Sequence, residues 1–172
     1  MLRVKDIEKS LKFYQEVMGM TLMRTSENEA AGFNLYFLGY PGTQGTAQDG
    51  KTAYREGLLE LTWNYGTEKD ANFKYHNGND EPQGFGHICK LTTPAIQTNA
   101  TQFFSTLCAN AGKLGMSVDD LDAACQRFED LKCNWRKRLT DGRMRNVAFL
   151  LDPDGYSVEI VQNDKFSDKY SV

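Results

Sequence analysis

The spacing of apolar residues over the first 65 positions predicts a strand, a helix and three further strands. An apolar run, Met1–Val4, opens the chain, and Asp6 follows as the N-cap of a helix that ends at Gly19. One face of this helix carries apolar residues at helical spacing: Ile7, Leu11, Tyr14 and Met18. Runs rich in aromatic and aliphatic residues then predict three strands, Thr21–Thr25, Phe33–Tyr40 and Leu58–Trp63, with a loop at Pro41–Thr52.

The second half of the chain repeats this order. We predict a strand at Phe85–Ile88 and a helix that begins after Asp120, with Leu121, Cys125 and Phe128 on one face. Three more strands are predicted near Trp135–Leu139, Val147–Leu151 and Val158–Gln162. The fold class is therefore α+β, with two β-α-β-β-β modules and mixed, curved sheets.

The residues repeat as well as the elements. The sequence VKDIE at 4–8 matches VDDLD at 118–122, and LEL at 59–61 matches VEI at 158–160. Duplicated units usually pack against each other to bury a shared face. We place the first module at 1–65, a linker at 66–84, the second module at 85–165 with an insert at 90–115, and a tail at 166–172.

Composition narrows the class of protein. A net charge of -3 and the absence of a basic run with interleaved aromatics argue against nucleic acid as a partner. No apolar stretch reaches the roughly 20 residues that span a bilayer, and the N-terminus lacks a signal-peptide pattern, so we predict a cytoplasmic protein without membrane contact. The four cysteines lack metal-site spacing and are interpreted as reduced thiols: Cys89, Cys108, Cys125 and Cys133.

Glu60 and Glu159 are the candidate chemical groups, because each lies in mid-strand between apolar neighbours at the same place in its module. A buried carboxylate without a cation or hydrogen-bond donors is costly, so a ligand role is attractive. The alternative is a carboxylate on a solvated strand face, which the equivalence in the repeat disfavours.

His87 on the predicted opening strand of the second module is the third candidate, although a lone histidine is more often a core residue than a ligand. With two symmetric glutamates it forms a donor set suited to zinc, nickel, cobalt or iron(II). The position equivalent to His87 in the first module falls upstream of Met1, so the repeat predicts a fourth ligand that this chain does not contain.

The chain resembles glyoxalase I of the vicinal-oxygen-chelate superfamily, in its eukaryotic type. The resemblance covers nearly the whole chain outside the insert and is carried by these blocks: Met1–Asp6, Ser10–Tyr14, Leu35–Leu38, Leu59–Asn64, Tyr75–Asn79, Gly84–Ile88 and Asp152–Tyr156. It implies a lactoylglutathione lyase that isomerises the methylglyoxal–glutathione hemithioacetal to S-lactoylglutathione, a detoxification reaction, by metal-assisted proton transfer through an enediolate. The implied metal is zinc, with nickel or cobalt possible, and the implied substrate contains glutathione.

By the same resemblance, the metal ligands are Glu60, His87 and Glu159, with Glu159 as the catalytic base. Arg3 and Asn64 match positions that hold the γ-glutamyl end of glutathione, while Lys137 and Met144 match positions around its glycyl end and the acyl pocket. Surface solvation is the alternative explanation for Arg3 and Lys137. The chain departs from many relatives at Gln83, where arginine often contacts glutathione, and at Ser157, where an aromatic residue is usual.

The resemblance also implies that sites form where modules meet, in a homodimer or in a fused chain of four modules of which this chain is half. Within the superfamily, the runner-up is an iron(II) extradiol dioxygenase, which the paired glutamates disfavour. A different class is an inactive binding protein with the same fold, or a truncated, mis-spliced gene product.

The insert Lys90–Gly115 would interrupt a strand between Cys89 and Met116. It contains no charged residue between Lys90 and Lys113, and its removal restores a normal strand-to-helix passage. We hypothesise a translated intron, because its codons can supply a donor at Cys89–Lys90, a branch site at Ala109–Asn110 and an acceptor at Leu114–Gly115. Sequencing the mature transcript tests this. The alternative is a genuine excursion, which a loop tolerates better than a ligand-bearing strand.

Overall fold

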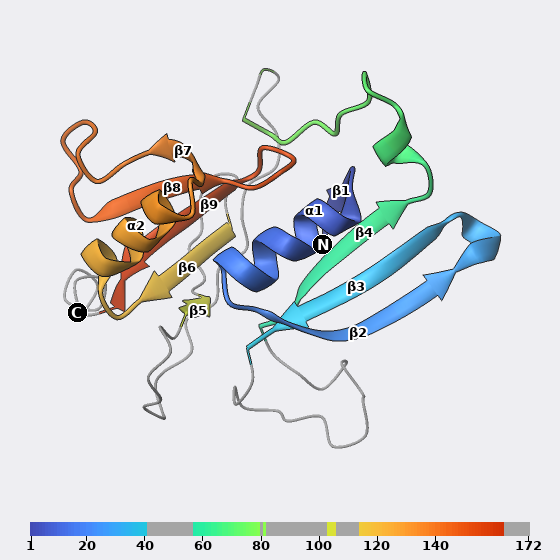
Figure 1. Cartoon of the computed structure of the whole chain (residues 1–172), viewed down its shortest axis with the longest axis horizontal. Helices are drawn as coiled ribbons and strands as arrows, with labels where there is room; N and C mark the ends of the chain where they lie inside the picture. Colours follow the sequence, from blue (N-terminus) through green and yellow to red (C-terminus); the bar gives the residue numbers. More distant parts are fainter. Residues whose placement is uncertain (41–56, 80, 82–102, 106–113, 164–172) are drawn as a thin grey trace. The chain divides into compact units, whose positions relative to one another are not determined.

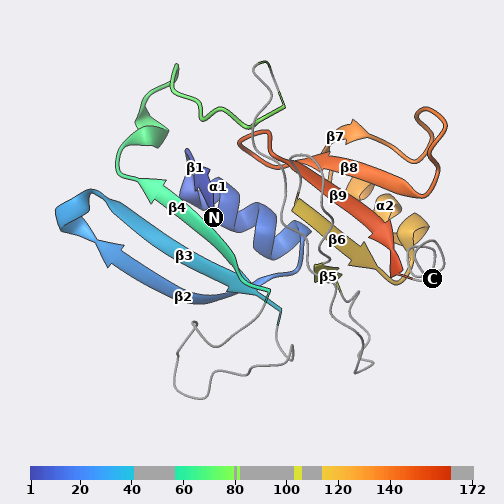
Figure 2. The ribbon, with the colours of Figure 1, turned by 180° about the vertical axis from the view of Figure 1, so that it is seen from behind.

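Each half of the chain forms one sheet with one helix on one of its faces. The computed structural model describes residues 1–40, 57–79, 81, 103–105 and 114–163, and it divides into a first unit, Met1–Tyr75, and a second unit, His76–Val172. Figures 1 and 2 show the helix of each unit from the two sides of the ribbon. The expected α+β class is confirmed.

The first unit has the predicted β-α-β-β-β order. Its elements are β1 (Leu2–Val4), α1 (Ile7–Lys12), a π-helical continuation (Phe13–Val17), β2 (Thr21–Asn28), a 3₁₀ turn (Glu29–Ala31), β3 (Phe33–Gly39), β4 (Leu59–Asn64) and a second 3₁₀ turn (Thr67–Lys69). The strand order in the sheet is β1-β4-β3-β2, in which β1 and β4 are parallel and the other pairs are antiparallel.

The second unit repeats the arrangement and adds one edge strand. Its elements are β5 (Phe103–Ser105), β6 (Leu114–Val118), α2 (Leu121–Asp130), β7 (Asn134–Lys137), β8 (Val147–Leu151) and β9 (Ser157–Gln162). The strand order is β5-β6-β9-β8-β7, in which β6 and β9 are parallel. The antiparallel strand β5 covers the outer edge of β6.

The two units share their strand registers, which confirms the internal repeat. Leu2, Arg3 and Val4 pair with Leu61, Thr62 and Trp63. At the equivalent positions, the register pairs Met116, Ser117 and Val118 with Ile160, Val161 and Gln162. The antiparallel partners agree as well, because Glu60 lies opposite Phe37 and Glu159 lies opposite Phe149.

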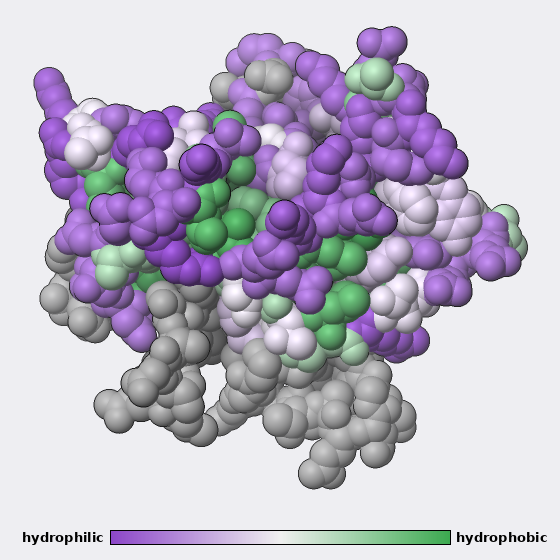
Figure 3. Space-filling view, in the orientation of Figure 1, coloured by the Kyte–Doolittle hydropathy of each residue, from purple (hydrophilic) through white to green (hydrophobic). Residues whose placement is uncertain are grey.

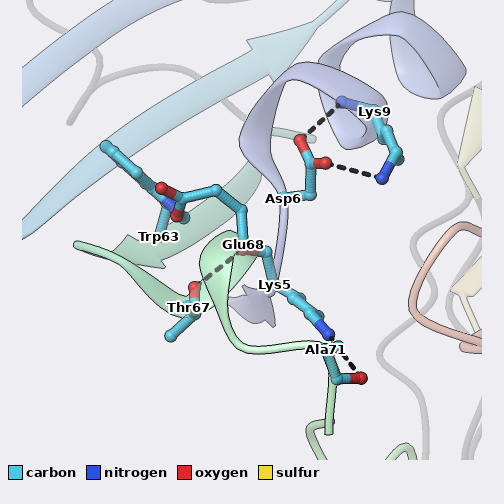
Figure 4. Close-up of polar contacts among 7 residues, drawn as sticks. All are labelled: Lys5, Asp6, Lys9, Trp63, Thr67, Glu68 and Ala71. Atoms are coloured by element: carbon cyan, nitrogen blue, oxygen red, sulfur yellow. Dashed lines mark hydrogen bonds and ion pairs between the residues drawn. The ribbon is translucent and has the colours of Figure 1, made fainter. Parts of the chain in front are cut away.

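Both helices begin at an aspartate whose side chain accepts a hydrogen bond from a backbone N–H of the first turn. Asp6 accepts from Lys9 N and Asp120 from Ala123 N, with φ of -129° and -131°. This is the usual role of an N-cap residue. Figure 4 shows Asp6 beside other contacts that join β1 to the segment after β4: Thr67 donates to the Lys5 carbonyl at 2.7 Å, and Lys5 donates to the Ala71 carbonyl at 3.4 Å.

Apolar side chains from the sheet and the helix form the core of each unit. In the first unit, the fully buried side chains include Val4, Tyr14, Met18, Leu38 and Leu61. In the second unit they include Met116, Val118, Phe128, Leu150, Val158 and Ile160. The Phe128 ring of α2 meets the Trp135 ring at 6.3 Å between centroids, which marks the helix-covered face of the second sheet.

Large exposed apolar side chains do not gather into one segment of the described chain. They are Met1, Tyr65, Leu131 and Met144, and Figure 3 shows hydrophilic residues over much of the visible surface. No helix within the described ranges is long and apolar enough to cross a membrane.

Several predicted boundaries differ from the structure. β2 continues past Thr25 to Asn28, and β7 ends at Lys137 rather than Leu139. Leu114 and Gly115, which were assigned to the insert, pair with Val158 and Glu159 as part of β6. They therefore hold the positions that Ile88 and Cys89 would take if Lys90–Gly115 were removed.

The predicted helix faces need a small rotation. Leu11 and Cys125 were predicted to face the core, but both are half-buried. The residue before each of them, Ser10 and Ala124, is buried instead, because the helix turns that residue toward the sheet. Both described cysteines, Cys125 and Cys133, are free thiols. The segments Phe85–Ile88, Pro41–Thr52 and 166–172, together with Cys89 and Cys108, lie outside the described residues.

Candidate functional site

Glu60 projects from the middle of β4, on the face of the first sheet opposite its apolar core. Its neighbours Leu59 and Leu61 point into that core and are buried. Glu60 itself is half-buried and lies opposite Phe37 of β3, with which it shares a face. Among the described residues, its carboxylate has no hydrogen bond and no ion pair.

Arg3 and Asn64 lie on the same sheet face as Glu60. Arg3 pairs in register with Thr62, which separates Glu60 from Asn64 along β4. The Arg3 Nη1 atom donates to Asn64 Oδ1 at 3.4 Å, and Asn64 Nδ2 donates to the Tyr75 hydroxyl at 2.7 Å. The structure therefore brings together three of the predicted site residues, a carboxylate, a guanidinium and an amide.

Thr62 adds a polar atom to this face. Thr62 is 3% exposed, and its Oγ1 has no hydrogen-bond partner among the described residues. A buried hydroxyl without a partner is uncommon, because its desolvation is not compensated. Thr62 is thus the buried polar residue between Glu60 and Asn64 on this face of β4.

Glu159 has the equivalent position in the second unit. It lies between Gly115 of β6 and Phe149 of β8, on the sheet face opposite α2. This face also carries a buried apolar cluster, Val147, Phe149 and Val161. The Glu159 side chain is half-buried and, within the described ranges, makes neither a hydrogen bond nor an ion pair.

Lys137 and Met144 are held together at the end of β7. The Lys137 Nζ donates to the backbone carbonyls of Met144 at 2.7 Å, Val147 at 2.9 Å and Arg138 at 3.2 Å. The Met144 side chain is exposed. Because an ammonium group has three N–H donors, these three carbonyls use all of them and leave Lys137 to act through its charge.

A polar network that the sequence did not predict lies beside Glu159. Arg136 donates from Nη1 to Ser157 Oγ at 2.6 Å and also to Asn79 Oδ1, and Ser157 Oγ donates to Asn79 Oδ1 at 3.1 Å. Asn79 Nδ2 donates to the Gly155 carbonyl at 2.7 Å. In the sequence, Asn79 stood out only as part of the family block Tyr75–Asn79, and Ser157 only as a departure from the family. Neither observation indicates that Arg136 contacts them.

The donor chemistry of the two glutamates fits a divalent cation. Each presents a half-buried carboxylate between core-facing neighbours, with no cationic partner in the described parts of the chain. His87 and Gln83 lie outside the described residues, and within the described ranges no three His, Cys, Asp or Glu side chains are grouped to hold a metal ion. Glu60 belongs to the first unit and Glu159 to the second.

Comparison with known proteins gives consistent results. The family model of the Glyoxalase/Bleomycin resistance protein/Dioxygenase superfamily matches residues 1–160. Glyoxalase I of Saccharomyces cerevisiae is 45% identical over 164 residues, which are 94% of this chain and 41% of the yeast protein. A lactoylglutathione lyase of Pseudomonas putida is 45% identical over 167 residues, covering 94% of this chain and 82% of that enzyme.

Solved structures show the same fold. The trypanothione-dependent glyoxalase I of Leishmania major superimposes with a TM-score of 0.62 and 24% identity, over 98% of this chain and 88% of that one. The chain thus spans less than half of the yeast relative but most of the two other proteins.

Proposed function

Because the chain belongs to the Glyoxalase/Bleomycin resistance protein/Dioxygenase superfamily, we propose that it is a lactoylglutathione lyase. The substrate is the hemithioacetal of glutathione and methylglyoxal, and the product is S-lactoylglutathione. The observation that carries the proposal is the symmetric placement of Glu60 and Glu159, each half-buried opposite a phenylalanine and without a partner among the described residues.

Glu60, His87 and Glu159 are the metal ligands in this proposal. A carboxylate–imidazole set suits zinc first, and nickel or cobalt next. Bound there, the ion supplies Lewis acidity that stabilises negative charge on the substrate oxygens. Phe37 and Phe149 support this assignment, since an apolar ring opposite each carboxylate lowers the local dielectric and strengthens its attraction for a cation.

Glu159 gives up its ligand role when substrate binds and is then the base that moves the proton. It removes the proton from the carbon that bears sulfur and returns it to the adjacent carbon, while the hydroxyl proton passes from the first oxygen to the second, so that the hydroxyl and carbonyl groups exchange places without any net oxidation. No hydride carrier is needed for this step. Glu60 takes no part in the proton transfer and serves only as a metal ligand.

Arg3 and Asn64 bind the γ-glutamyl end of glutathione, which is zwitterionic. The Arg3 guanidinium supplies donors for the carboxylate, and the Asn64 amide can both accept and donate. Lys137 contributes positive charge near the glycyl end, and the exposed Met144 side chain contributes apolar surface. These groups orient the substrate and leave the chemistry to Glu159.

The assembly and the location are part of the same proposal. We propose a cytoplasmic protein that works as a homodimer or as one half of a fused chain of four modules. The 41% coverage of the yeast relative is compatible with the fused arrangement, and the 82% coverage of the Pseudomonas enzyme with the dimeric one.

The deciding experiment follows S-lactoylglutathione formation by absorbance, with zinc-reconstituted protein and preformed hemithioacetal. Wild type should turn over, and Glu159→Gln should lose activity by about a hundredfold or more, as expected when an acid–base group is removed. Glu27→Gln, an exposed glutamate of the same length on β2, is the control and should keep its activity. Inactivity of the reconstituted wild type would reject the proposal and favour a binding protein without catalysis.

A further inference from the structure

Arg136 occupies a β-bulge in β7, the strand that pairs with β8 and therefore with Phe149. Trp135 pairs with Leu150 and Lys137 pairs with Phe149, so Arg136 is the extra residue between two consecutive partners. Trp135 contacts α2 through Phe128, whereas Lys137 shares the opposite face with Phe149 and Glu159. A bulge of this kind re-aims a side chain.

The Arg136 side chain reaches the Glu159 face. Its contact with Ser157 shows this, because Ser157 and Glu159 are two residues apart on β9 and their side chains project from the same side of the sheet. Their Cα atoms are about 7 Å apart in an extended strand. The guanidinium thus lies at the edge of the same surface that holds the proposed base.

The guanidinium is anchored at one end only. Both hydrogens of Nη1 are used, one by Ser157 Oγ and one by Asn79 Oδ1, and Ser157 is 1% exposed. Asn79 is fixed in turn by the Gly155 carbonyl and by its own N–H, which donates to Asn77 Oδ1 at 3.0 Å. Nε and Nη2 have no partner among the described residues, and no acidic side chain in those ranges contacts Arg136.

The remaining donors have the geometry of a carboxylate site. Nε and Nη2 point in parallel along one edge of the guanidinium plane, which matches the two oxygens of a carboxylate. The adjacent Lys137 cannot offer this arrangement, because its three donors are committed to backbone carbonyls. Of Arg136 and Lys137, only Arg136 therefore has N–H groups available to donate hydrogen bonds to a ligand.

We propose that Arg136 binds a carboxylate of the glutathione moiety through Nε and Nη2, with Ser157 and Asn79 as positioning residues. The inference rests on the proposed function, and it adds a substrate-binding residue to that site. Glutathione has two carboxylates, one on glycine and one on the γ-glutamyl residue, and either can supply this chemistry.

The test is calorimetric binding of S-hexylglutathione, an adduct that cannot react, to the full chain. Two analogues accompany it: the glycyl ethyl ester, and the peptide in which γ-aminobutyrate replaces the γ-glutamyl residue. Arg136→Gln should weaken binding of S-hexylglutathione about ten- to a hundredfold. For the analogue that lacks the recognised carboxylate, wild type and Arg136→Gln should bind within about twofold of each other.

Arg138→Gln is the matched control. It removes the same charge from the same part of the chain, but Arg138 is bonded to Glu129 and lies over the Trp135 ring, so its loss should leave all three affinities unchanged. A purely structural role for Arg136 predicts equal losses for the adduct and both analogues. That result would overturn the inference, as would an unchanged affinity in Arg136→Gln.

Binding and turnover separate the two proposals. The inference stands if the wild type binds S-hexylglutathione and Arg136→Gln weakens this binding but not the binding of the analogue that lacks the recognised carboxylate. This holds even if the hemithioacetal is not isomerised. If the wild type does not bind S-hexylglutathione, the assignment of Arg136 is rejected, whatever the lyase assay shows.

Discussion

Phe149 lies directly opposite Glu159 across the β8–β9 pair, on the face of the sheet that does not carry α2. Phe37 has the same relationship to Glu60 in the first unit. An apolar ring beside a carboxylate excludes water from one side of it and makes an ionic partner more valuable. The pairing therefore connects the strand register with the proposed metal site.

Glu60→Gln and Glu159→Gln should each weaken zinc binding. Zinc affinity should fall at least about 10- to 100-fold, because an amide is a poorer ligand than a carboxylate. That range is the effect of removing a residue that only hydrogen-bonds to a ligand, so removing a ligand itself should have no smaller effect. Competition with a chelator of known affinity measures it, and Glu27→Gln on the same sheet as Glu60 is the control. Equal zinc affinity in all four proteins would contradict the ligand assignment.

Loss of either N-cap should destabilise its unit. Asp6→Ala and Asp120→Ala each remove a side-chain acceptor from a helix N-terminus, which costs about 1 kcal/mol in the free energy of unfolding. Urea titration measures the change. Asp6→Asn and Asp120→Asn are the controls, since asparagine caps helices about as well as aspartate. Equal losses in the Ala and Asn variants would show that the caps act through charge alone.

The contribution of Asp6 should depend on pH. The Lys9 ammonium, which lies 2.8 Å from Asp6 Oδ2, holds the pKa of the Asp6 carboxyl below its ordinary value of 3.8, and asparagine cannot form this ion pair. Its stabilising effect is therefore fully present above that ordinary value and is lost as the pH falls through the lowered one. The difference in unfolding free energy between wild type and Asp6→Asn should shrink between about pH 6 and about pH 2. A difference that grows on acidification would contradict this sign.

Gly155→Ala should destabilise the second unit more than Gly142→Ala does. Both glycines have positive φ, +84° and +67°, so each substitution has a backbone cost of about 1 kcal/mol. At Gly155, the new Cβ would also lie 2.7 Å from Asn77 Nδ2, whereas nothing lies within 4 Å at Gly142. Thermal unfolding compares the two variants. Equal shifts in Tm would show that the Asn77 side chain moves away without penalty.

Arg3→Ala and Asn64→Ala should act non-additively on S-hexylglutathione binding. The two side chains share a hydrogen bond of 3.4 Å on the Glu60 face, so removing one disturbs the other. We expect a coupling of about 0.5–3 kcal/mol in a double-mutant cycle measured by calorimetry. Strict additivity would mean that the two residues contact the ligand independently or not at all.

The sequence predicted the parts of the fold that depend on local pattern and repetition. The matching VKDIE and VDDLD segments predicted both capped helices, and the LEL and VEI triplets predicted the equivalence of Glu60 and Glu159. The structure agrees because capping and strand alternation involve neighbours in sequence. The family resemblance predicted that Arg3 and Asn64 bind the same end of glutathione, and the 3.4 Å contact between them is a finding of the structure.

The network of Arg136, Asn79 and Ser157 could not be predicted in this way. Arg136 and Asn79 are 57 residues apart in sequence, and they meet because β7 contains a bulge next to Lys137. A bulge leaves no mark in the alternation of a strand as short as Asn134–Lys137. For a similar reason, β5 was missed, since pairing with the edge of β6 depends on the partner strand rather than on FFS at 103–105.

The common register of β1–β4 and β6–β9 has an evolutionary meaning. Strand pairing changes by whole steps, and a slip of one residue would turn every side chain to the other face, so registers persist while sequences diverge. Two units that differ in most of their side chains and still pair at equivalent residues are best explained as copies of one ancestral gene segment. Duplication of such a segment also explains why each unit carries one mid-strand glutamate opposite a phenylalanine, Glu60 opposite Phe37 and Glu159 opposite Phe149.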